Sequence, residues 1–241
     1  PEKWKKAMEA AAEAISVAEK FNSELGRQNF MLYTSADSSL PNDERGRRNY
    51  RDAFTKEHWN GLEFIEAKGD RGGCQTLQQL MGPRPIANNM SLGWKTTSVP
   101  TMEAVEMYYT KNGLPWEDDP ETKDIDPYAY NAEAGTVNLH LYKEPRFYAS
   151  VGYDRGTYEI DGGGELHGST LKETDEYQSC TGYLCQKWIP KASTYSIPSN
   201  SFSFYYYAYP YLRLPELYLS YAEADFEYNG SLSTQSLEYI N

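Results

Sequence analysis

The sequence predicts a mainly α protein with irregular loops and short strands, in which tetratricopeptide-like helical hairpins bracket a long loop-rich region. Two observations predict this class. Apolar residues recur at helical spacing near both ends of the 241-residue chain, whereas nearly all Gly and Pro residues lie between those ends. We therefore predict three parts: a helix of the array over residues 1–26, a loop-rich region with short strands over residues 27–210, and a truncated helical hairpin over residues 211–241.

The first segment has the pattern of an amphipathic helix. Its apolar positions are three or four residues apart, and Lys and Glu fill most of the others; the apolar stripe is Trp4, Met8, Ala11, Ile15 and Ala18. We expect this stripe, Trp4 included, to be buried. The helix should end between Asn22 and Gly26, where Gly26 can serve as a C-terminal cap.

A second helix is predicted from about Pro215 to Tyr228, because Pro is tolerated in the first turn of a helix. Asn229-Gly230 should end it, and Ser233 is a suitable N-cap for the next helix. Such a short connection predicts an antiparallel hairpin. Because the chain starts and stops inside predicted helices, we expect it to be a portion of a longer protein.

Short elements are predicted in the middle of the chain. Three runs have strand-like composition: Leu62–Ala67, Arg146–Tyr153 and Gly182–Ile189. Met102–Tyr109 should be a short helix with Thr101 as its N-cap, and Asp161–Gly164 a turn. No long amphipathic helix is predicted here, and Gly69–Gly93 is expected to be a loop. Loops of this length in a compact protein usually carry function.

Composition restricts the class of partner. The chain has 23 basic and 35 acidic residues, a net charge of −12, which disfavours binding to nucleic acid because phosphates are repelled. No run of 18 apolar residues is present, so no membrane-spanning helix is predicted. Aromatic residues make up 15%, with 22 Tyr, a usage that suits sheltered but hydrated surfaces such as those that bind sugars.

Catalytic and metal chemistry have little support in the sequence. His58, His140 and His167 are far apart and lack the spacing of a metal site or a triad, so we predict no metal, no catalytic residue and no cofactor. Carboxylates at Glu117–Asp119 could be imagined as a glycosidase pair, but an acidic run in such a loop is usually just solvated.

The three cysteines leave two interpretations open. Cys180 and Cys185 could form a disulfide in an oxidising compartment. The alternative is three free thiols, Cys74 among them.

Five segments, in one order along the chain, carry a resemblance to a known family. They are Lys3–Ile15, Pro100–Pro115, Lys143–Tyr148 with Val151–Tyr153, Thr181–Trp188, and the helix motif Tyr211–Ala224. Together they resemble the SusD/RagB family of outer-membrane glycan-binding lipoproteins. One departure is Pro215, which stands where the family usually has Ala. The family's N-terminal part, with its lipid-attachment Cys, is missing, so membrane anchorage rests on the resemblance alone.

The resemblance implies a function of capture without catalysis. A SusD-like protein at the outer face of the outer membrane would hold an oligosaccharide or polysaccharide against a SusC-like TonB-dependent transporter. It would need no cofactor, and a lipid anchor would be its contact with the membrane. Two rivals stay open: a glycoside hydrolase or other glycan-processing enzyme, and a helical-repeat scaffold that binds peptide.

Sugar capture needs flat aromatic rings and planar polar groups. Of the five Trp residues, Trp59, Trp94 and Trp116 lie in loop-like contexts, whereas Trp4 and Trp188 have core-like ones. We favour Trp94, in the stretch that contributes to the ligand face in the resembling family. The predicted ligand-binding residues are Trp94, Arg84, Asn88, Asn89 and Trp59. For Tyr205–Tyr207, just before the helix motif, packing is the first interpretation and ligand contact the second.

Overall fold

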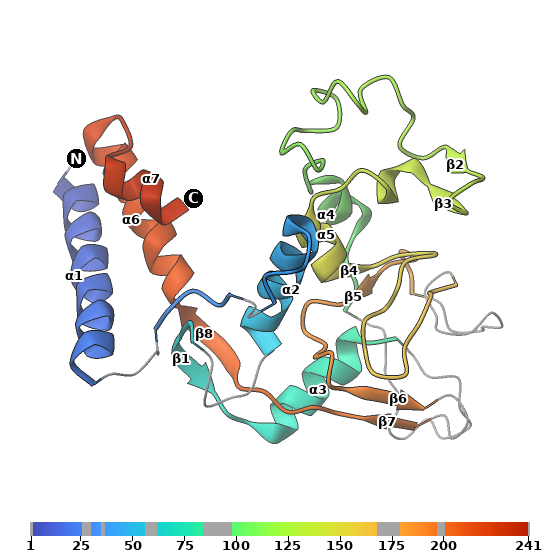
Figure 1. Cartoon of the computed structure of the whole chain (residues 1–241), viewed down its shortest axis with the longest axis horizontal. Helices are drawn as coiled ribbons and strands as arrows, with labels where there is room; N and C mark the ends of the chain where they lie inside the picture. The colour runs from blue at the N-terminus through green and yellow to red at the C-terminus, as the bar shows by residue number, and fades with distance from the viewer. Residues whose placement is uncertain are drawn as a thin grey trace. The chain divides into compact units, whose positions relative to one another are not determined.

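The computed structural model describes residues 2–25, 30–34, 37–55, 62–83, 98–167, 179–196 and 201–240 (Figure 1). The chain forms two compact units. Unit 1 comprises residues 1–34, 57–69 and 208–241, and unit 2 comprises residues 35–56 and 70–207.

Where the structure describes it, unit 1 is mostly helical and contains one pair of strands. Its elements are α1 (Glu2–Leu25), β1 (Phe64–Lys68), β8 (Tyr209–Arg213), α6 (Leu214–Asn229) and α7 (Thr234–Ile240).

Unit 2 contains short helices and very short strands. Its elements are α2 (Asn42–Thr55), α3 (Arg71–Met81), α4 (Met102–Glu106), β2 (Tyr130–Asn131), β3 (Thr136–Val137), the 3₁₀ helix η2 (Asn138–His140), α5 (Pro145–Ser150), β4 (Val151–Gly152), β5 (Leu184–Cys185), β6 (Thr194–Ser196) and β7 (Ser201–Ser203). Helices with short strands and irregular loops confirm the predicted fold class.

The helices of unit 1 pack through small residues. α1 lies beside α6, and α7 folds back on α6 (Figure 1). Ala11, Ile15 and Ala18 of α1 are buried, as expected from the stripe, and α1 ends at Leu25 as predicted. The prediction for Trp4 was wrong, since 38% of its surface is exposed. Ala11 is the first residue of the stripe that is buried. Trp4 precedes it near the start of α1 and therefore lies outside the buried part of the helix.

A two-stranded antiparallel sheet leads into α6. β1 pairs with β8, and the backbone N–H of Leu214 donates to the carbonyl oxygen of Glu63 at 2.8 Å. Arg213 Nη1 lies 2.8 Å from Glu63 Oε2, and the backbone N–H of Tyr33 donates to the other carboxylate oxygen at 2.7 Å. Burial raises the pKa of Glu63, and this effect outweighs the hydrogen bond from Tyr33 and the charge of Arg213, which both lower the pKa. The start of α6 is therefore fixed by hydrogen bonds and by Pro215 in its first turn.

Asp225 joins α6 to α7. Its carboxylate accepts hydrogen bonds from Asn229 Nδ2 at 2.8 Å, from the backbone N–H of Ser233 at 2.8 Å and from Ser236 Oγ at 2.5 Å. Ser233 caps α7 as predicted, because its Oγ accepts from the backbone N–H of Ser236. Gly230 adopts φ +72° at the end of α6. The hydrogen bonds from Ser233 and Ser236 hold the pKa of Asp225 well below its usual 3.8.

Replacing Asp225 with Asn should therefore lower the free energy of unfolding at pH 7 by about 2 kcal/mol, because charged acceptors are lost from a buried turn. Since the folded-state pKa is depressed, this stabilisation is fully present above pH 3.8 and is lost as the pH falls through the folded-state pKa. Urea unfolding of both proteins between pH 7 and pH 2 measures the difference. The exposed neighbour Glu227→Gln is the control and should change stability by less than about 0.5 kcal/mol. A difference that stays constant over this pH range would contradict the account.

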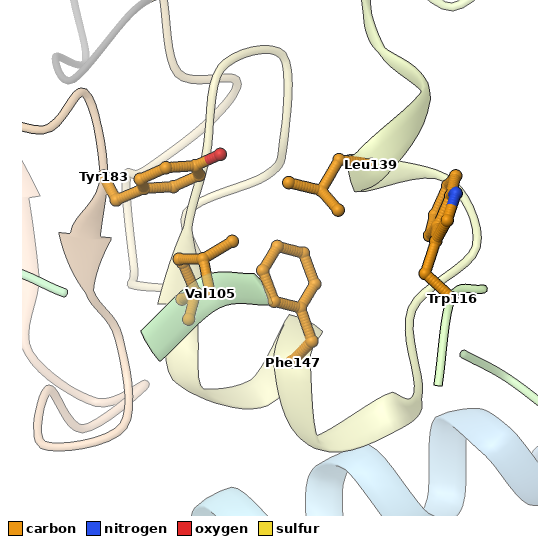
Figure 2. Close-up of a cluster of buried hydrophobic side chains, with 6 residues drawn as sticks. Val105, Trp116, Leu139, Phe147 and Tyr183 are labelled. Carbon is orange, nitrogen blue, oxygen red and sulfur yellow. The ribbon is translucent and has the colours of Figure 1, made fainter. Parts of the chain in front are cut away.

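Two buried apolar clusters lie among the described residues of unit 2. The first is Tyr158, Ile160, Leu166, Leu184 and Ile189. The second, called the Phe147 cluster below, is Val105, Trp116, Leu139, Phe147, Val151 and Tyr183. In Figure 2, Phe147 lies in the middle of this cluster, with Trp116 at one edge and Tyr183 at the opposite edge.

α2 and α3 contradict the prediction that the middle of the chain lacks long helices. α2 packs against α5, yet its buried positions include the polar Arg51 and Thr55, so a hydrophobic pattern does not reveal it. α3 occupies part of the predicted loop Gly69–Gly93. Its N-cap Asp70 accepts from the backbone N–H of Gly72 at 3.0 Å. Its buried Gln78 donates to the carbonyl oxygen of Tyr205 at 2.8 Å, so a polar residue again faces the interior.

The short elements agree with the predictions in part. β1 overlaps the predicted strand Leu62–Ala67 but starts two residues later and ends one residue later. Thr101 caps α4 through its Oγ1, which accepts from Ala104 N at 3.2 Å. The strand predicted over Arg146–Tyr153 was wrong. Pro145 starts helix α5 instead, and only Val151–Gly152 is strand. Gly182–Ile189 contains the two-residue strand Leu184–Cys185.

Candidate functional site

A pocket with a volume of about 360 Å³ lies in unit 2. We call it the α4 pocket, because several of its residues come from the end of α4 and the segment that follows. Its lining residues are Glu106, Met107, Tyr108, Tyr109, Pro115, Trp116, Glu117, Pro127, Tyr128, Leu139 and Lys143. They come from four short stretches of one continuous segment, residues 106–143.

Trp116 and Leu139 are the buried apolar residues of the lining and belong to the Phe147 cluster (Figure 2). Trp116 is 9% exposed, and its Nε1–H donates to the carbonyl oxygen of Ile125 at 3.1 Å. Thr122 Oγ1 donates to the carbonyl oxygen of Trp116 at 2.7 Å. The indole is therefore held in one orientation, with its N–H engaged inside the protein.

Asp119 stabilises the turn that carries Trp116. Its carboxylate accepts from Thr110 Oγ1, from Asn112 Nδ2 and from the backbone N–H of Glu121. The hydrogen bond from Thr110 is the largest cause of a lowered pKa for Asp119. Asp119 is thus a buried structural carboxylate, which is not the solvated residue that the sequence suggested.

Lys143 is buried beside the pocket, with 2% of its surface exposed. Its Nζ donates to the carbonyl oxygens of Glu106 at 3.1 Å and Tyr108 at 2.6 Å. These carbonyls lie at and just beyond the C-terminal end of α4, where a cation is favoured. Burial lowers the pKa of Lys143. Lys143 therefore fixes the chain that provides Glu106, Tyr108 and Tyr109 to the pocket.

The exposed lining residues include aromatic and acidic side chains beside Met107 and Pro115. Tyr109 and Tyr128 are 47% and 49% exposed. The hydroxyl of Tyr128 donates to the carboxylate of Glu106, which raises the pKa of Tyr128 to about 12. Glu117 is exposed beside the buried Trp116. Aromatic faces next to carboxylate acceptors can bind a ligand that has both apolar C–H groups and hydroxyl donors.

His140 is the histidine closest in sequence to the lining, and its surroundings are those of a core residue. Its Nδ1 lies 2.7 Å from Thr136 Oγ1, and its Nε2 lies 2.8 Å from Tyr183 Oη. Burial lowers the pKa of His140 to about 4, so the ring is neutral at pH 7. In the described part of the chain, no group of three or more His, Cys, Asp and Glu residues is placed to hold a metal ion.

The predicted ligand-binding residues Trp94, Arg84, Asn88, Asn89 and Trp59 all lie outside the described residues. Trp116 is the third Trp that the sequence placed in a loop-like context. In the structure it is a core residue that also lines the α4 pocket.

Other sequence candidates have structural roles. Tyr207 is buried, and its hydroxyl donates to the carbonyl oxygen of Trp188 at 2.8 Å, in agreement with packing as the first interpretation. Cys74, Cys180 and Cys185 are free thiols in the structure. Burial raises the pKa of the Cys185 thiol.

Sequence reasoning missed Glu106, Tyr128 and Lys143 as members of one site. Lys143 was quoted only as the first residue of a family motif. Tyr108-Tyr109 stood at the end of the predicted helix Met102–Tyr109, and the pair of aromatic rings was a usable signal. In the structure this helix ends earlier, at Glu106, so both rings lie beyond it.

Comparison with known proteins identifies the family. The SusD family matches residues 62–241, and the chain therefore belongs to the SusD family. This confirms the resemblance found in the sequence. A comparison with curated proteins gave no match.

Solved structures show the same fold. Two structures of a protein named BT4246, one with selenomethionine, have TM-scores of 0.72 and 0.71 and are 18% and 20% identical to this chain. The matches cover 100% of this chain and 45% and 44% of BT4246. A SusD-like protein (BF3747) from Bacteroides fragilis NCTC 9343 has a TM-score of 0.61 at 16% identity, over 98% of this chain and 43% of that one. This chain thus spans less than half the length of these structures.

No helix in the described residues is both long enough and apolar enough to cross a membrane.

Replacing Lys143 with Met should lower the free energy of unfolding by about 2 kcal/mol, because the two carbonyl oxygens at the end of α4 lose their buried donor. Urea unfolding at pH 7 measures the change. Lys123→Met, at an exposed position of the same segment, is the matched control and should leave stability nearly unchanged. Equal effects of the two substitutions would show that Lys143 does not fix this chain segment.

Proposed function

We propose that this protein captures carbohydrate without cleaving it. The observation that carries the proposal is the match of the SusD family over residues 62–241. The α4 pocket supports it, since Trp116, Tyr109 and Tyr128 place aromatic rings beside the carboxylates of Glu106 and Glu117. Rings that face C–H groups and acceptors that bind hydroxyls are the two requirements of sugar recognition.

The cellular role proposed here follows from the family. The protein would act at the outer face of the bacterial outer membrane, held by a lipid anchor, and deliver oligosaccharide or polysaccharide to a SusC-like TonB-dependent transporter. The net charge of −12 agrees with a ligand other than nucleic acid.

Two titratable groups close in sequence to the pocket lining, Asp119 and His140, are engaged within the fold. The hydrogen bonds of Asp119 hold it as a carboxylate within a turn, and burial keeps His140 neutral between Thr136 and Tyr183. Both side chains serve the fold, so neither is available to transfer a proton to a ligand.

The main ligand contacts proposed are the residues favoured by the sequence: Trp94 and Trp59 as ring platforms, and Arg84, Asn88 and Asn89 as partners of sugar hydroxyls. Trp94 is the contact on which this assignment depends most.

Replacing Trp94 with Ala should weaken binding of the best ligand from a glycan array by about tenfold or more, because the ring platform is removed. Isothermal titration of the wild-type protein and the variant measures the change. Trp4→Ala removes a partly exposed Trp from α1 and is the matched control, with affinity expected to stay unchanged. Unchanged affinity in Trp94→Ala would remove this residue from the site.

A further inference from the structure

We propose that the α4 pocket, whose lining comes from residues 106–143, is a second sugar-binding site and that it takes one hexopyranose ring without an anionic group. This inference rests on the proposed function, because it assumes a carbohydrate ligand. It concerns residues outside the set of ligand-binding residues predicted from the sequence, and all of its lining lies in the described part of unit 2.

The size of the pocket limits its occupant. A volume of about 360 Å³ is at the lower end of the range of about 300–1,000 Å³ found for small-molecule pockets. It suits one sugar ring within the pocket. The apolar lining, with Trp116, Leu139, Pro115 and Pro127, provides surfaces on which the C–H groups of such a ring can pack.

The hydrogen-bonding groups of the pocket select a ligand rich in donors. Three donors of the lining already have acceptors within the protein: Trp116 Nε1 donates to Ile125, Lys143 Nζ to Glu106 and Tyr108, and Tyr128 Oη to Glu106. The carboxylates of Glu106 and Glu117 are acceptors. A sugar hydroxyl supplies its own proton to such a group, and a hydrogen bond to a charged acceptor is among the stronger ones.

The charges of the pocket exclude anionic sugars. Among its eleven lining residues, all of them described, Glu106 and Glu117 are acidic and Lys143 is the one cation. The ammonium group of Lys143 is buried and engaged with two carbonyl oxygens. A uronate or a sulfate group would therefore meet two carboxylates without a cation free to pair with it.

The test uses the Trp94→Ala variant, so that the main proposed site is disabled, and saturation-transfer NMR with simple glycosides. The probes are methyl β-D-glucopyranoside, methyl β-D-galactopyranoside, methyl α-D-mannopyranoside and methyl β-D-glucopyranosiduronate. At least one neutral glycoside should bind Trp94→Ala, and the glucuronide should bind more weakly.

Two pairs of further substitutions in this background locate the binding. Glu117→Ala and Tyr109→Ala alter the lining at exposed positions, and each should weaken binding of the neutral glycoside by about tenfold. Asp118→Ala and Tyr130→Ala alter exposed neighbours outside the lining and should leave it unchanged. Unfolding curves confirm that each variant is folded.

The outcomes separate the two proposals. Sugar binding by the wild-type protein that disappears entirely in Trp94→Ala overturns the second site and leaves the proposed function standing. Binding in Trp94→Ala that neither Glu117→Ala nor Tyr109→Ala weakens overturns the assignment to the α4 pocket. Preference for the glucuronide overturns the class of sugar. If the wild-type protein binds no saccharide on the array, both proposals fail.

Discussion

The buried guanidinium of Arg51 is the interaction on which the structure of unit 2 depends most. Arg51 is 0% exposed. Its Nη1 lies 2.7 Å from Glu159 Oε2, and its Nη2 donates to the carbonyl oxygens of Glu159 at 2.6 Å and Ile189 at 2.8 Å. It therefore connects α2 to two segments more than a hundred residues further along the chain. Removing one partner of a buried ion pair typically costs about 3–5 kcal/mol, because the other charge is left without compensation.

The surroundings of Glu159 explain why this buried pair stays ionised. Burial alone would raise the pKa of Glu159, but Arg51, Arg47 and Lys191 outweigh it and the pKa is lowered. Arg47 Nη1 is 3.0 Å and Lys191 Nζ is 3.4 Å from the carboxylate. The arrangement is a network of three cations on one carboxylate, which is worth more than an isolated surface pair.

The candidate site follows from this arrangement by packing. α2 packs against α5, and α5 contributes Phe147 to the cluster that also contains Trp116 and Leu139. Lys143, two residues before α5, holds the end of α4 through its carbonyl oxygens. Buried contacts thus hold Trp116 and Leu139 in the lining, and they hold the chain that carries Glu106. The α4 pocket therefore needs little reorganisation to accept a ligand.

The sequence predicted a helix correctly where the buried face of that helix is apolar, and it missed the helices whose buried face includes polar residues. α1 and α6 have apolar or small residues at helical spacing, and both were predicted with nearly correct ends. α2 and α3 bury Arg51 and Gln78, whose hydrogen-bond partners come from distant segments, so no local pattern shows that these positions are interior.

The α4 pocket was missed for a related reason. It combines residues from 106 to 143 that come together only in the folded structure, around the Phe147 cluster, and a short helix or turn carries no periodic signal. Pro145 gave a local signal for the start of α5, but the alternation from Arg146 to Tyr153 was given more weight. Trp94 and its polar neighbours remain a prediction from the sequence and the family.

Recovery of the bound glycan tests the central claim, capture without cleavage, most directly. The protein is incubated with the glycan that binds best on an array, and the glycan is released and analysed by mass spectrometry and by assay of reducing ends. We predict saturable binding and recovery of the glycan at its original length. Shorter products or new reducing ends would contradict the claim and favour a glycan-processing enzyme.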